Sequence, residues 1–171
     1  MAADNLLSKW AIWVEGQGKV GNAKEYTPPA LEVQTIDFQA GDMDMPIPVD
    51  GGMAAMEASF ALFGIDLDVL PLFGIRSGSS PKLMVRSYYT DRLGNTKEVV
   101  EELHGMITKI ERDAQDTGNQ REKTMKVTMK LDYYKVTSAG TVLVEISPLT
   151  HVRKLDDVDV LSSIQSTLAA S

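Results

Sequence analysis

The spacing of apolar side chains follows a period of two along much of the chain, which is the spacing of β-strands. The alternation is most regular from Thr124 to Val136. Apolar residues occupy every second position at the start of this segment, namely Met125, Val127, Met129 and Leu131. Threonine, lysine and aspartate fill the positions between them. A strand of this length with one wholly polar face is typical of an antiparallel sheet that has water on one side.

Shorter segments with strand-like patterns indicate further strands. They cover residues 10–15, 31–38, 57–63, 82–89, 99–110 and 141–146. The segments 82–89 and 99–110 flank the turn sequence DRLGN, so we expect them to pair as a hairpin. Together these segments predict a mainly β fold with antiparallel pairing, arranged as a sandwich or a barrel-like sheet.

Helical spacing is confined to two short segments. The first segment runs through Phe73, and the side chain of Asp66 or Asp68 could cap its start. In the second, at about 157–169, apolar residues recur at helical spacing, and Asp156 or Asp157 is placed to cap. The sequence therefore predicts one or two short α-helices beside the strands.

Residues 39–56 lack a regular pattern and are expected to be a long irregular loop. The stretch holds three glycines, two prolines and four of the nine methionines. At about 18 residues it is longer than most connections in compact domains, and such loops are usually functional or disordered. Its apolar side chains are unlike those of a solvated linker. Two interpretations stay open: the loop folds back over its own core, or a partner subunit covers it.

Composition excludes several functional classes. The length of 171 residues corresponds to a single domain, assigned to residues 1–171. The absence of cysteine, with only His104 and His151 as histidines, argues against the usual zinc, iron–sulfur and cysteine-nucleophile sites. A formal net charge of −7 argues against binding to nucleic acid through its phosphates. No signal-peptide pattern and no run of about 18 apolar residues occurs, so we expect a reducing, cytosol-like compartment and no membrane insertion.

Charged residues are distributed unevenly. Residues 25–75 contain nine carboxylates and no lysine or arginine, whereas residues 121–135 contain five basic side chains. Complementary segments of this kind could guide one copy of the chain onto another. The alternative is that both segments are solvated and bind no partner.

No motif predicts catalysis or a bound cofactor. Gly16, Gly18 and Gly21 have the spacing of a dinucleotide-binding fingerprint, but two prolines follow too soon for the helix that such a site requires. We interpret these glycines as a hairpin or loop. Glu101 and Glu102 are adjacent on a predicted strand, so they point to opposite faces and cannot act as an acid–base pair. We therefore expect no enzyme activity, no cofactor and no metal.

Residues 39–63 resemble a known family. The run AGDMDMPIPVDGGMAAMEASF is similar to a segment of the major tail tube proteins of contractile-tailed phages and of the related R-type bacteriocin tubes. Two further pieces agree with that family. They are DYYKV at 132–136 followed by EISP at 145–148, and VRKLDDVDVL at 152–161, which looks like the family's ending of a strand, a turn and a terminal helix.

The resemblance implies a subunit that forms hexameric rings, which stack into a hollow tube inside a contractile sheath and conduct DNA to the host. Long hairpins of neighbouring copies would join edge to edge into one closed barrel around the channel. The implied partners are further copies of the chain and the tail sheath, tape-measure, baseplate and tail terminator proteins. DNA would pass through without specific binding. The implied location is the virion, after synthesis and assembly in the bacterial host cytoplasm.

Two alternatives to the phage tube remain. One is the tube of an R-type bacteriocin or a type VI-like contractile system, which would share the same physics of assembly. The other, more remote, is a monomeric soluble β-domain that binds a ligand.

The resemblance also implies roles for particular residues. The residues assigned to contact with the adjacent subunit or ring are Gly41, Asp42, Met43, Asp44, Met45, Pro46, Ile47, Pro48, Val49, Asp50 and Met53. The residues assigned to the channel are Glu32, Gln34, Glu57, Ser59, Lys109, Glu111, Thr124, Lys126, Thr128 and Lys130. Lys126 and Lys130 need acidic side chains beside them for charge balance, and Glu57, Glu32 and Glu111 are the candidates.

Overall fold

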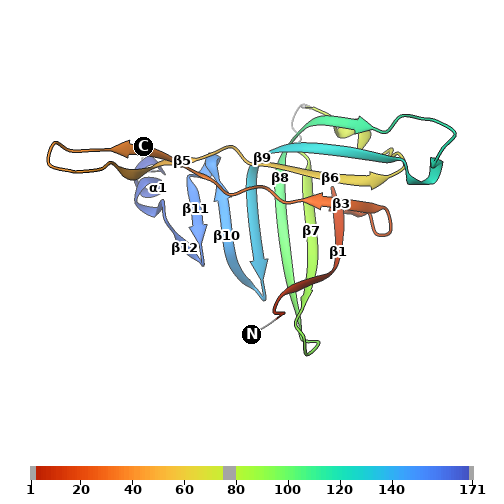
Figure 1. Ribbon diagram of the computed structural model, residues 1–171, viewed down its shortest axis with the longest axis horizontal. Coiled ribbons are helices and arrows are strands. Elements are labelled where there is room, and N and C mark those ends of the chain that lie inside the picture. The colour runs from red at the N-terminus through yellow and green to blue at the C-terminus, as the bar shows by residue number, and fades with distance from the viewer. Residues whose placement is uncertain (1–2, 75–79, 170–171) are drawn as a thin grey trace.

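The computed structural model describes residues 3–74 and 80–169, whose regular structure is almost entirely β (Figure 1). The strands are β1 Leu6–Val14, β2 Gln17–Gly18, β3 Ala23–Thr27, β4 Val33–Phe38, β5 Ile47–Met53, β6 Glu57–Phe63, β7 Lys82–Thr90, β8 Thr96–Arg112, β9 Thr124–Ser138, β10 Thr141–Ser147, β11 Val152–Leu155 and β12 Val158–Asp159. The helical elements are the 3-10 turns η1 Leu70–Leu72, η2 Gln120–Glu122 and η3 Pro148–Thr150, and the α-helix α1 Ser162–Ala169. The mainly β class is confirmed.

Ten strands form one antiparallel sheet in the order β12-β11-β10-β9-β8-β7-β1-β2, with β6 attached to β9 and β3 to β6. The long strand β9 pairs with β6 through Thr124–Lys130 and with β10 through Tyr134–Ser138. β9 therefore belongs to two layers, which run across each other in Figure 1. We call β3, β6, the first half of β9 and the second half of β8 the first layer, and the rest of this sheet the second layer.

β8 and β9 bend together at Gly105, where the two layers separate. Their register shifts between His104 and Gly105 and again between Ile107 and Lys109. A Cβ at Gly105 would lie 2.1 Å from the carbonyl oxygen of Lys130, so a larger residue cannot fit without moving backbone. Register shifts of this kind bend paired strands, and here they turn the hairpin from one layer into the other.

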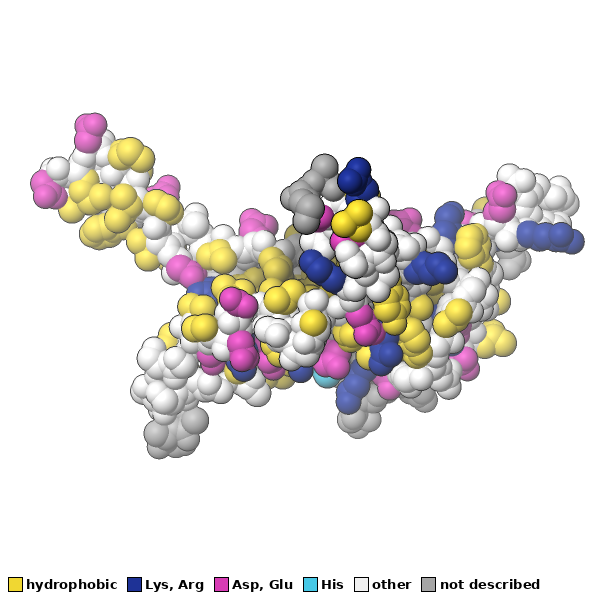
Figure 2. All heavy atoms as spheres, turned by 90° about the horizontal axis from the view of Figure 1, so that it is seen from below, with side chains coloured by type: hydrophobic (Ala, Val, Ile, Leu, Met, Phe, Trp, Pro, Cys, Tyr) yellow, Lys and Arg dark blue, Asp and Glu magenta, His cyan; other side chains and the backbone are white. Residues whose placement is uncertain are grey.

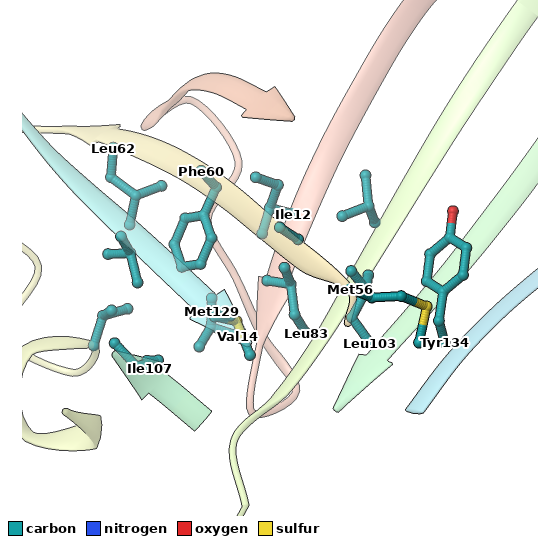
Figure 3. Packing of buried hydrophobic residues seen from close by; sticks show 14 of the residues in the cluster. Ile12, Val14, Met56, Phe60, Leu62, Leu83, Leu103, Ile107, Met129 and Tyr134 are labelled. Carbon is teal, nitrogen blue, oxygen red and sulfur yellow. The ribbon is translucent and has the colours of Figure 1, made fainter. Parts of the chain in front are cut away.

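The hydrophobic core lies between these layers (Figure 3). Its largest buried side chains are Ile12, Phe60, Leu62, Val69, Leu83, Val85, Leu103, Ile107, Met125, Val127 and Met129. Met125, Val127 and Met129 are at most 1% exposed, which confirms the apolar face predicted for the long strand. Leu131, at the end of that face, is only partly buried.

The helical predictions are confirmed only in part. α1 begins at Ser162, five residues after the predicted start at 157. Asp156 and Asp157, expected to cap it, have φ values of 47° and 63° and form the two-residue turn that pairs β12 with β11. An N-cap residue typically has extended backbone, so these two left-handed residues do not cap a helix. The segment after Asp66 is the 3-10 turn η1 rather than an α-helix, although the Asp66 carboxylate does accept backbone N–H groups there.

Residues 33–53 form a two-stranded hairpin that we call the arm. Among the described residues its strands, β4 and β5, pair only with each other. The prediction of an irregular loop over 39–56 is therefore wrong for Ile47–Met53, which is a strand. Pro48 is tolerated because both strands of a lone hairpin are edge strands. The arm projects away from the two layers in Figure 1, so the chain does not fold it back over its own core.

Candidate assembly surfaces

The first layer carries a polar face opposite the core. Residues paired across antiparallel strands share a face, and the pairs in this layer include Glu57 with Lys130, Ser59 with Thr128 and Glu111 with Lys126. We define the polar face as Glu25, Thr27, Glu57, Ser59, Lys109, Glu111, Thr124, Lys126, Thr128 and Lys130. Eight of the ten residues predicted to line a channel are among them. The period of two in the sequence thus identified a surface that the fold does assemble.

Charges on the polar face are balanced. Its three glutamates and three lysines cancel formally, and no aspartate or arginine belongs to it. The Lys109 Nζ lies 2.8 Å from Glu111 Oε1, and this hydrogen bond keeps the pKa of the Glu111 carboxyl below its usual value. Lys126, paired with Glu111, lowers that pKa further. Of the three glutamates expected to balance the lysines, Glu57 and Glu111 lie beside them in register.

Glu32 and Gln34 do not lie on the polar face. Glu32 precedes β4, and its carbonyl oxygen accepts the Ala54 N–H at the root of the arm. Gln34 lies in β4 at a register shift opposite β5. The alternation of 31–38 predicted a strand there, and the strand that forms, β4, belongs to the arm. The expected charge balance of the lysines by Glu32 is not found in this chain.

The acidic and basic segments of the sequence meet within one copy. β6 carries Glu57 and β9 carries Lys130, and these two strands are paired. The acidic residues that remain far from this basic strand include Asp37, Asp42 and Asp44 in the arm, all of them exposed. Part of the complementarity expected between copies is therefore already satisfied inside each copy.

The first layer ends in two open edges. Among residues 3–74 and 80–169, β3 has β6 on one side and no strand on the other. In the same part of the chain, residues 108–112 of β8 pair with β9 alone, and the isolated bridges on the other side reach only Ile107. Each edge leaves backbone N–H and C=O groups available to a strand from another molecule.

The arm carries all eleven residues that the sequence assigned to contact between copies. One face of its strands exposes large apolar side chains, with Ile36 at 62% and Phe38 at 54%, and Met45 in the connecting segment is 68% exposed. Figure 2 shows apolar and acidic side chains together on this projection. Contiguous exposed apolar surface on a projecting hairpin indicates a surface that another molecule covers.

A buried polar cluster was not foreseen from the sequence. The Tyr134 hydroxyl donates a hydrogen bond to Glu101 Oε1 inside the core, and burial raises the pKa of that carboxyl. The Tyr26 hydroxyl is also buried and has no hydrogen-bond partner within the described residues. The prediction that Glu101 and Glu102 face opposite ways is confirmed, since only Glu101 is buried. The sequence did contain one indication of this. Glu101 lies two residues before Leu103, so both side chains are on the same face of the strand, and Leu103 is a core residue.

The described residues contain no cluster of histidine, cysteine, aspartate or glutamate suited to a metal ion. None of the helices among them has the length and apolar character needed to cross a membrane.

Comparison with known proteins identifies the family. The family model described as phage tail tube protein FII matches residues 4–168. The chain belongs to this family. Among known tail tube proteins, it is 27% identical over 158 residues to the major tail tube protein of Serratia phage KSP20, covering 91% of this chain and 90% of that one. It is 26% identical over 165 residues to the tail tube protein of Escherichia phage P2, covering 94% and 95%.

Solved structures of contractile systems share the fold. The tube family member resembles a chain of the sheath–tube complex of the PVC extracellular contractile injection system, with a TM-score of 0.58, 9% identity and coverage of 77% and 89%. It also resembles a chain of the anti-feeding prophage tube cap, with a TM-score of 0.61, 11% identity and coverage of 81% and 95%. The resemblance to contractile-phage tail tubes noted from the sequence is confirmed. The chain is a structural component of a phage tail and not an enzyme.

Proposed function

We propose that this chain forms hexameric rings that stack into a hollow tube within a contractile sheath, and that the tube conducts phage DNA to the host. The first layer carries the proposal, because it combines a polar face with two open edges on opposite sides. Joining the β3 edge of one copy to the β8 edge of the next removes both edges in a closed ring. A barrel of many strands leaves an aqueous interior, which the polar face would line.

The charge pattern suits a channel that must pass DNA without holding it. A channel wall that binds phosphates tightly needs an excess of lysine and arginine. On the polar face each lysine has an acidic counterpart, and the whole chain has a formal charge of −7. The proposal therefore includes DNA passage without specific binding.

The arm supplies contacts between neighbouring subunits or rings. Fully burying one large apolar side chain contributes about 1.5–3 kcal/mol, so covering Ile36, Phe38 and Met45 would stabilise a stacked tube substantially. Pro46 and Pro48 limit the backbone freedom lost when the arm docks. A chain with a related fold occurs in the PVC sheath–tube complex, which supports a sheath around this tube. The proposed further partners are the tape-measure, baseplate and tail terminator proteins, and the proposed site of synthesis is the host cytoplasm.

The test is assembly of the purified chain, followed by sedimentation and negative-stain microscopy over a range of concentrations. We expect rings or tubes from the wild-type chain. Met45→Asp is expected to leave a folded subunit that cannot assemble. Leu93→Asp is the matched control, because Leu93 is a similarly exposed apolar residue, 73% exposed, in the turn between β7 and β8. A wild-type chain that stays monomeric at high concentration, or a Met45→Asp chain that forms normal tubes, would refute the proposal and leave a monomeric binder as the alternative.

A second candidate function is the tube of an R-type bacteriocin or a type VI-like system. The shared fold with two contractile injection system proteins favours it. Both candidates predict the same rings and tubes. They differ in the particle that carries the chain, since a phage tail is attached to a DNA-filled head. Electron microscopy of particles released from the producing cell, labelled with an antibody to the chain, separates the two.

A further inference from the structure

The arm joins the rest of the chain through a β-bulge at its root. The register of β4 and β5 shifts between Val33 and Thr35, which places Gly51 and Gly52 opposite the single residue Gln34 and gives β5 one extra residue. Gly52 has a φ of +102°, a conformation that other residues rarely adopt. A bulge bends its hairpin and increases its local twist. Because β4 and β5 pair only with each other among the described residues, no pairing with a strand of the two layers fixes the direction in which the arm leaves them.

One ion pair ties this bulge to the second layer. The two terminal nitrogens of Arg153, in β11, lie 2.5 Å from Asp50 Oδ2 and 3.4 Å from Asp50 Oδ1. A guanidinium that contacts both oxygens of a carboxylate fixes orientation as well as distance. Asp50 Oδ1 also accepts the Gly52 N–H at 2.8 Å, so one carboxylate holds both the bulge and the arginine. The Arg153 hydrogen bond keeps the pKa of the Asp50 carboxyl below its usual value.

Arg153 is a rigid anchor for this contact. β11 is paired with β10 on one side and β12 on the other, and the Arg153 side chain is only 12% exposed. Its backbone N–H donates to Asp159 Oδ1 at 3.3 Å, which adds a contact with β12. Beside the bulge lies an open pocket of about 510 Å³, lined in part by Met53 and Ile164. The ion pair thus joins a strand that is paired on both sides to the root of a hairpin that pairs only with itself among the described residues.

We infer that Arg153 is a positioning residue, whose ion pair with Asp50 sets the direction of the arm before assembly. The consequence for assembly rests on the proposed function. In the proposed tube the arm docks on a neighbouring copy. An arm that is already held in one direction loses less conformational entropy on docking than an arm whose direction varies. Subunits without the ion pair would fold normally and assemble less readily.

The orientation can be measured directly in single subunits. The chain has no cysteine, so spin labels at Asp42→Cys in the arm tip and Thr141→Cys in β10 report one distance by pulsed electron paramagnetic resonance. The Met45→Asp background keeps the chains unassembled. We expect a narrow distance distribution in this background, and a broader one with a shifted mean when Arg153→Gln is added.

Three further variants separate the ion pair from other effects. Asp50→Asn keeps an oxygen for the Gly52 N–H but loses the charge, so a broader distribution there arises from the lost ion pair. Arg153→Lys keeps the charge and is expected to restore part of the narrow distribution. Asp116→Asn is the matched control, because it breaks an ion pair with Lys123 in which the carboxylate is 56% exposed, compared with 47% for Asp50. Asp116→Asn is expected to leave the distance distribution between the two spin labels unchanged.

Assembly gives the second measurement, in chains with native Met45. Loss of the pair is expected to raise the concentration needed for tubes about tenfold. An unchanged distance distribution in Arg153→Gln overturns the inference, even if wild-type chains form tubes. If wild-type chains form no tubes, the proposed function fails, while the distance measurement still decides whether the ion pair orients the arm.

Discussion

Replacing Glu101 with glutamine is expected to stabilise the folded subunit at neutral pH. Glu101 is 9% exposed, and burial raises the pKa of its carboxyl. Tyr134 donates a hydrogen bond to this carboxyl, while the buried Tyr26 hydroxyl lacks a partner among the described residues. Glutamine keeps an oxygen for Tyr134 and adds N–H groups, one of which can donate to the Tyr26 hydroxyl.

The size and pH dependence of the effect follow from this arrangement. One added buried hydrogen bond contributes about 1 kcal/mol net, and a neutral amide avoids the desolvation cost of a charged carboxylate. Because the folded pKa of Glu101 lies above the unfolded value, its favourable contribution is complete below the unfolded pKa and is lost as pH rises through the folded one. The advantage of glutamine should therefore be about 1 kcal/mol or more at neutral pH and shrink as the solution is acidified.

Urea unfolding of unassembled chains, in the Met45→Asp background, measures this difference at neutral and at mildly acidic pH. A higher midpoint with an unchanged slope reports a gain in stability. Glu102→Gln is the control, because Glu102 lies next to Glu101 on the opposite, partly exposed face of β8. The reasoning is refuted if Glu101→Gln unfolds at an equal or lower midpoint at neutral pH, or if its gain does not shrink in acid.

Two further predictions concern stability and use the same urea assay. Gly105→Ala should cost about 1–3 kcal/mol, because the added Cβ would lie 2.1 Å from the carbonyl oxygen of Lys130; an unchanged midpoint would show that the bend relaxes freely. Lys19→Met should cost about 3 kcal/mol, because Lys19 Nζ lies 2.9 Å from Asp66 Oδ2 and both side chains are at most 10% exposed. Asp68→Asn, which removes only the exposed partner of Lys19, should cost less than about 1 kcal/mol, and equal losses for both variants would contradict this account.

A strand of the two layers could be predicted from the sequence where one of its faces is apolar and the other is polar. β9 alternates between core and polar face from Thr124 to Lys130, and β6 was predicted to the residue. β3 was missed because its sequence, AKEYT, is short and shows only one large apolar side chain, Tyr26. A strand that contributes so little to the core carries almost no periodic signal, and its pairing with β6 decides its structure.

The arm marks the limit of local sequence rules. Pro46, Pro48 and the glycine pair at 51–52 indicate a loop when a strand is expected to lie inside a sheet. In a lone hairpin the same residues are compatible with pairing, and the glycines form the bulge at its root. The polar face was predictable from β9, whereas the position of Glu32 and Gln34 outside it was not, because alternation does not tell which sheet a strand joins. Asp50 and Arg153 are 103 positions apart in the sequence, and the residues around each of them do not indicate that the two side chains form an ion pair.

Gly105 connects the folding of one copy to the closure of many. The proposed contact joins the β3 edge of one copy to the β8 edge of the next. Each added copy therefore presents the same free edge again. A row of copies joined in this way either closes into a ring or grows without limit. Which outcome occurs depends on the curvature of the first layer. That curvature is set where β8 and β9 shift register on either side of Gly105, close to the backbone of Lys130. In the proposed ring, the same bend that separates the two layers around the core would help to set the angle at which the β8 edge of one copy meets the next copy.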